Sequence, residues 1–142
     1  MSEADRITYA ALLARLSLGV MFIAHALLKI IVFTLPGTVQ FFESVGLPGP
    51  LAYVTIAAEL GGGILLVLGV YTRNVALALV PILLGAAWVH LGNGWVFNAP
   101  KGGWEYPVFL VVMALIVALL PHRRFAAFPS VKAGTPRKLA RA

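Results

Sequence analysis

Two ionisable side chains lie one helical turn apart in the first apolar stretch of the chain, His25 and Lys29 in the sequence His-Ala-Leu-Leu-Lys. Residues four apart share one face of a helix, so both groups are expected to point to the same side. A titratable group at membrane depth is costly and normally faces a bundle interior, a partner or water. We therefore expect these two side chains to face the polar groups of later helices, namely Glu59, His90 and Glu105.

Helical rise places all five groups in the same half of a bilayer, at about 1.5 Å per residue along antiparallel helices. Glu59 carries the most weight because it lies in the middle of an apolar stretch and is too short to reach the interface. It must be protonated or paired with Lys29 or a histidine. The sequence therefore predicts a shared polar pocket near one membrane surface.

Each of these residues also has a purely structural interpretation. Lys29 could extend to the membrane surface, and His90 could cap a helix end and bond the next loop. Glu105 at a helix start would favour the helix dipole. The glycines 61–63 could serve only to let the second span touch the first. Arg15 is expected to anchor the opposite membrane surface.

Three chemistries fit the five residues, and their spacing does not select among them. A quinone head group could bond to His25 or Lys29 and exchange protons with Glu59. His25 and His90 could ligate a haem, or they could hold a transition metal together with Glu59. The sequence has no sequential metal motif, phosphate loop or nucleophile elbow. Without cysteine it also offers no thiol chemistry or disulfide.

The composition indicates an integral membrane protein. Of the 142 residues 61% are hydrophobic and 11% are charged, and that charged share is about half of what soluble domains carry. The net charge is +6, and basic residues gather near the C-terminus. Such a tail suits an anionic membrane surface, and no nucleic-acid-binding module is present.

The apolar stretches predict an all-α membrane protein, a four-helix transmembrane bundle with a short interfacial helix after the first span. A polar lead over residues 1–8 precedes the spans. Lysines and arginines favour one side, which predicts cytoplasmic N- and C-termini. The expected transmembrane domain covers residues 1–124, and a basic cytoplasmic tail covers 125–142. The expected spans are residues 9–35, 51–71, 75–91 and 104–120, and the interfacial helix falls within 38–50.

A set of spaced residues resembles the DoxX family of small bacterial inner-membrane proteins. The set is Arg15, Gly19, His25, Lys29, Gly46-Leu47-Pro48, Glu59, Gly62-Gly63, Gly69, Thr72-Arg73, His90 and Glu105-Tyr106. Ala26 stands where the family commonly has glycine, and the C-terminal segment departs from the usual ending. The resemblance implies a four-helix transmembrane bundle and an association with membrane redox proteins.

The expected function is that of a membrane redox-complex subunit that binds a quinone-like or other small ligand. His25, Lys29 and Glu59 would form the inner shell, and His90 and Glu105 would lie at the mouth. The alternative is a non-enzymatic chaperone or scaffold that binds a partner membrane protein, its polar groups acting as internal glue. The expected partners are the lipid bilayer and a redox protein, and homo-oligomerisation is left open.

Overall fold

The computed structural model describes residues 1–122, so the expected tail over 125–142 lies outside the described residues. All regular secondary structure in the described range is helical, with a π-helical turn (η1) and a 3-10 turn (η2). The elements are α1 (Glu3–Leu27), η1 (Leu28–Val32), α2 (Leu35–Ser44), α3 (Leu51–Leu68), α4 (Thr72–His90), η2 (Leu91–Asn93) and α5 (Glu105–Leu119).

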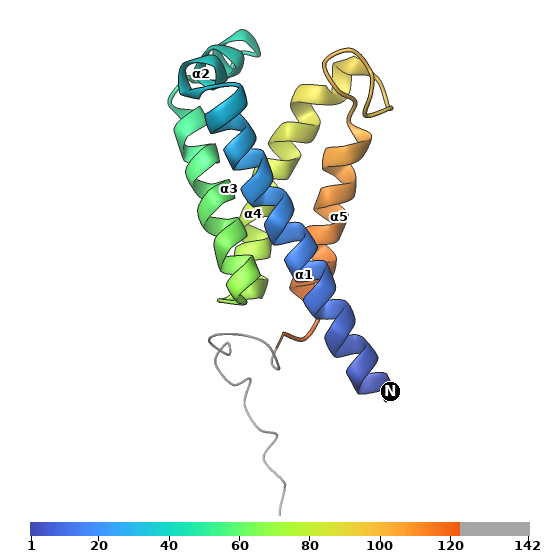
Figure 1. Ribbon diagram of the computed structural model, residues 1–142. Coiled ribbons are helices and arrows are strands. Elements are labelled where there is room, and N and C mark those ends of the chain that lie inside the picture. Colours follow the sequence, from blue (N-terminus) through green and yellow to red (C-terminus); the bar gives the residue numbers. More distant parts are fainter. Residues whose placement is uncertain (123–142) are drawn as a thin grey trace, which may run out of the picture.

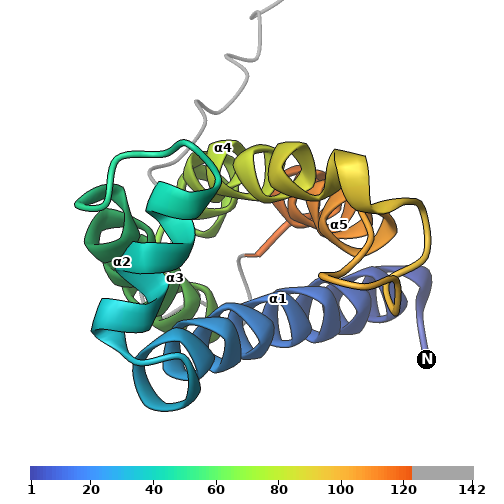
Figure 2. The same cartoon turned by 90° about the horizontal axis from the view of Figure 1, so that it is seen from above.

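Four helices form a ring in which α1 packs on α3 and α5, and α4 packs on the same two helices (Figure 2). The short helix α2 lies across one end of α3, which we call the α2 end. The loop from α4 to α5 lies at this same end, and the N-terminus lies at the opposite one (Figure 1). Toward the α2 end, α1 and α3 diverge from α4 and α5 (Figure 1).

The first helix begins earlier than predicted, because residues 3–8 are helical and not a polar lead. Ser2 caps it: the Ser2 hydroxyl oxygen accepts a bond from the Asp5 N–H at 3.1 Å, and Asp5 Oδ2 accepts one from the Ser2 N–H at 3.2 Å. This reciprocal capping box satisfies backbone donors that a helix start otherwise leaves unpaired. The cap therefore extends α1 beyond its apolar segment.

Three helical stretches are long and apolar enough to cross a membrane: Glu3–Val32, Leu51–Leu68 and Thr72–Asn93. The predicted fourth span, α5, is apolar but has 15 residues. At 1.5 Å per residue it measures about 22 Å, against a hydrocarbon core of about 30 Å. The prediction of an all-helical chain with long apolar spans is confirmed, and α5 is shorter than predicted.

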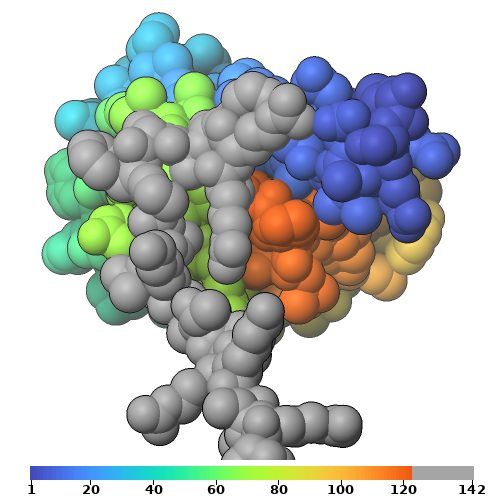
Figure 3. Space-filling view, turned by 90° about the horizontal axis from the view of Figure 1, so that it is seen from below, coloured from blue at the N-terminus to red at the C-terminus, as the bar shows by residue number. Residues whose placement is uncertain are grey.

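The core lies between α1, α3, α4 and α5 and consists of leucine, valine, alanine and phenylalanine side chains. At the end opposite α2, side chains of α1 and α5 lie side by side (Figure 3). Arg15, expected as a surface anchor, is 3% exposed and is thus enclosed by protein. The clustered core residues are Leu18, Phe22, Leu66, Ala76, Leu79, Leu83, Leu110, Ala114, Val117 and Ala118.

Two glycines set the close approach of α1 and α3. A Cβ atom added to Gly63 would lie 2.8 Å from the Gly19 carbonyl oxygen, and one added to Gly19 would lie 2.9 Å from the Gly63 carbonyl oxygen. Of the three predicted contact glycines, only Gly63 makes this contact. Gly62 faces Leu79 of α4, and a Cβ on Gly61 would meet nothing within 4 Å.

We predict that Gly63→Ala lowers the stability of the protein by about 1–3 kcal/mol, because the added methyl group must force two helix backbones apart. Unfolding by a denaturing detergent, followed by circular dichroism, measures the change. Gly61→Ala is the matched control, and it should leave stability unchanged or slightly raised. Equal stability of the two variants would contradict the assigned contact.

Candidate functional site

A partly buried ion pair joins η1, which continues the first helix, to α3 near the α2 end. Lys29 Nζ lies 2.7 Å from Oε2 and 2.9 Å from Oε1 of Glu59. Glu59 is 6% exposed, and the Lys29 side chain is 18% exposed. Lys29 therefore turns inward toward the α3 carboxylate, which is the pairing that the mid-span position of Glu59 predicted. It does not simply extend to the membrane surface.

The backbone around Lys29 is shaped to hold this pair. Lys29 belongs to η1, whose π-helical turn is closed by a bond from the Phe33 N–H to the Leu28 carbonyl oxygen at 3.0 Å. Such single turns are uncommon and occur often at functional sites. The Thr38 hydroxyl of α2 lies within bonding distance of two carbonyl oxygens, Lys29 O at 3.0 Å and Thr34 O at 2.9 Å. Helix α2 thereby contacts the backbone of Lys29.

His25 lies one turn before Lys29 and contacts α5. Its ring stacks on Tyr106, with centroids 5.8 Å apart and planes inclined by 27°. His25 Nδ1 lies 2.9 Å from the Met21 carbonyl oxygen, which can only accept, so Nδ1 carries the proton. In the neutral ring Nε2 is then an acceptor, and no described residue hydrogen-bonds to it.

His90 and Glu105 hold the loop between α4 and α5. The Asn93 amide lies 3.3 Å from His90 Nδ1 and donates to the carbonyl oxygens of Lys101 and Gly102 at 3.1 and 2.9 Å. Glu105 Oε1 accepts a bond from the Phe97 N–H at 2.8 Å. His90 thus contacts a residue of the next loop, as its structural interpretation held. Glu105 instead bonds to the loop backbone, and no side chain caps the start of α5.

The five predicted residues form two groups in the structure. Lys29 and Glu59 form the ion pair, and His25 lies one turn from it against Tyr106. His90 and Glu105 contact the loop. Within residues 1–122 no three histidine or carboxylate side chains gather in a group that could hold a metal ion, so His25, His90 and Glu59 form no such set.

Two residues of this site were not predicted as members, Tyr106 and Thr38. Tyr106 was named only among the residues of the family resemblance, and its contact with His25 depends on how α1 and α5 cross. Thr38 was placed in the predicted interfacial helix, and no hydrogen-bonding partner was predicted for it. Its bond to Lys29 depends on the reversal at Thr34, where φ is 63°, a conformation rare for threonine.

We predict that Lys29→Met and Glu59→Leu each lower stability by about 3 kcal/mol, because each leaves the other charge buried and unpaired. The double variant should lose much less than the sum of the two. Denaturing-detergent titration of all four proteins gives the coupling energy. Glu43→Gln, at an exposed position of α2, is a control expected within about 0.5 kcal/mol of wild type. Additive losses would show that the two side chains do not interact.

Comparison with known proteins identifies the family of this chain. The DoxX family model matches residues 10–92, the stretch that contains the ion pair. The chain is 37% identical over 124 residues to "Putative oxidoreductase CatD" of Bacillus subtilis, covering 87% of each chain. It is 36% identical over 78 residues to "Inner membrane protein YphA" of Escherichia coli, covering 54% of each. No solved structure shows significant similarity to the chain. The chain belongs to the DoxX family and is a membrane protein.

Proposed function

We propose that the protein is a subunit of a membrane redox complex and binds a quinone-type head group beside His25, Lys29 and Glu59. The observation that supports this most is the partly buried ion pair one helical turn from an imidazole whose Nε2 is available. Lipid-soluble quinones reach such a site through the membrane. The name of the Bacillus subtilis relative, an oxidoreductase, is in keeping with this proposal.

Each of the three side chains has a role in this proposal. A quinol hydroxyl donates a hydrogen bond to His25 Nε2, the acceptor in the neutral ring. Lys29 donates to the second ligand oxygen when it turns from Glu59, and Glu59 then takes up a proton. Oxidation of the quinol would release two protons and two electrons: the protons would pass to His25 Nε2 and to Glu59, and both electrons would pass to a redox partner protein. His90 and Glu105 hold the loop at the mouth of the site.

The site lies in the outer half of the inner membrane if the protein follows the distribution of basic residues, with both termini in the cytoplasm. In this arrangement α5 completes the fourth crossing. Its shortness is accommodated by local thinning of the bilayer and by flanking residues. The aromatic residues of the loop between α4 and α5 then lie at the periplasmic interface.

A scaffold that binds a partner membrane protein is the second candidate. It is favoured by the fact that Lys29 and Glu59 satisfy each other and that His90 and Glu105 contact their own loop. In this case the polar groups only join the helices. Chemical analysis of the purified protein distinguishes the two: co-purified quinone supports the first, whereas a colourless protein without ligand that captures a specific partner supports the second.

We predict that Glu59→Gln abolishes quinone binding while the protein still inserts and folds, because the amide still accepts a bond from Lys29 but cannot take up a proton. Quinone bound per protein, measured after extraction from nanodiscs, is the readout. Glu43→Gln should bind as wild type does. Full quinone binding by Glu59→Gln would refute the assignment of the site. A Soret band or a stoichiometric metal in the wild-type protein would show that the ligand is a haem or a metal ion and not a quinone.

A further inference from the structure

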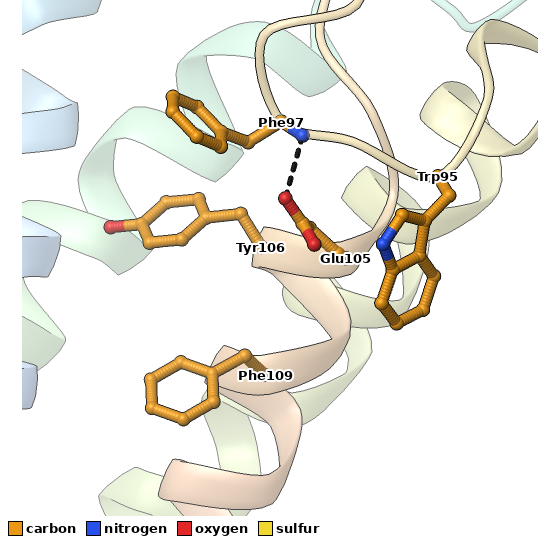
Figure 4. A pocket seen from close by; sticks show the side chains of 5 residues that line it. All are labelled: Trp95, Phe97, Glu105, Tyr106 and Phe109. Atoms are coloured by element: carbon orange, nitrogen blue, oxygen red, sulfur yellow. Dashed lines mark hydrogen bonds between the residues drawn. The ribbon is translucent and has the colours of Figure 1, made fainter.

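A separate cavity of about 350 Å³ opens between the loop from α4 to α5 and the start of α5. Four aromatic side chains and one carboxylate line it: Trp95, Phe97, Tyr106, Phe109 and Glu105 (Figure 4). Phe97, Tyr106 and Phe109 project to one side, Trp95 lies on the other, and Glu105 stands between them (Figure 4). This volume is at the lower end of the range for small-molecule sites.

The carboxylate of Glu105 is held in a fixed position. Oε1 accepts a bond from the Phe97 N–H at 2.8 Å, and the Glu105 N–H donates to the Trp95 carbonyl oxygen at 3.1 Å. Oε2 has no hydrogen-bonding partner within residues 1–122. The cavity therefore contains a carboxylate that is already oriented and has one oxygen available.

A cavity lined by aromatic rings and a carboxylate favours the binding of a cation. Ring faces carry negative electrostatic potential and attract cations within about 6 Å of their centroids, most strongly quaternary ammonium groups. The start of α5 carries the positive end of the helix dipole, which disfavours a cation, so binding depends on the charge of Glu105. The basic residue of this loop, Lys101, does not line the cavity.

We propose that this cavity binds a quaternary ammonium group, either that of a free small molecule or that of a lipid head group. The cavity differs from the proposed quinone site, because none of His25, Lys29 and Glu59 lines it. Two residues connect the sites: Tyr106 stacks on His25, and Glu105 holds the loop at the mouth of the quinone site. The ammonium group would lie against Glu105 Oε2 and the aromatic side chains that line the cavity with it.

The test uses the full-length protein in nanodiscs made of phosphatidylglycerol, titrated with choline and followed by tryptophan fluorescence, to which Trp95 contributes. The uncharged carbon isostere of choline, with a tert-butyl group in place of trimethylammonium, is the matched ligand. We expect choline to bind at least about tenfold more tightly than the isostere. A second arm replaces part of the lipid by phosphatidylcholine and looks for displacement of choline.

Glu105→Gln should weaken choline binding about tenfold or more, because the amide keeps the bond to Phe97 but loses the charge. Phe109→Leu should weaken it through loss of a ring. Glu43→Gln, which removes a negative charge on α2, should bind choline as wild type does, and so should Lys29→Met and Glu59→Gln.

Displacement of choline by phosphatidylcholine identifies a lipid head group as the source of the ammonium group, and the absence of displacement identifies a free cation. Equal binding of choline and its isostere, or full binding by Glu105→Gln, would refute the proposal.

Discussion

The contact between Lys29 and Glu59 is the interaction on which this end of the bundle depends. A single charge among apolar helices costs several kcal/mol, and the cost falls only when an opposite charge is held at bonding distance. The two groups come from α1–η1 and α3, so their helices must stay in register. Gly19 and Gly63 bring these helices into backbone contact, and Thr38 of α2 contacts the lysine backbone. Packing and charge pairing thus support each other.

The remaining polar groups of this end serve a second purpose. His90 and Glu105 do not join the ion pair but shape the loop between α4 and α5 through Asn93 and Phe97. This loop presents aromatic side chains around the Glu105 carboxylate. His25 stands between the two groups, because it shares a helix with Lys29 and stacks on Tyr106 of α5. One end of a small bundle therefore carries two distinct polar environments.

Helix positions were predictable from the sequence because apolar runs, glycines and prolines mark the spans. The pairing of Glu59 was predictable too, since a carboxylate at mid-span needs a partner and Lys29 was available. The π-helical turn at Lys29 was not, because it depends on tertiary contacts with α2. The contact of His25 with Tyr106 was not predictable either. Contacts between side chains of different helices depend on the angle at which the helices cross, and the hydrophobic periodicity of a sequence does not give that angle. Helix α5 is two residues shorter than predicted, because Trp104 and Leu120 are not part of it; the predicted span over 104–120 was itself shorter than the roughly 20 residues that cross the hydrocarbon core.

The most direct test of this account is the distance between Lys29 Nζ and Glu59 Cδ in a lipid bilayer, measured by solid-state NMR dipolar recoupling. The protein would be labelled with ¹⁵N at lysine side chains and ¹³C at glutamate carboxyls, and Lys29→Met would identify the signal. The account predicts a strong coupling that this variant removes, as required by a separation of 2.7 Å between Nζ and Oε2. A spectrum without that coupling would contradict it.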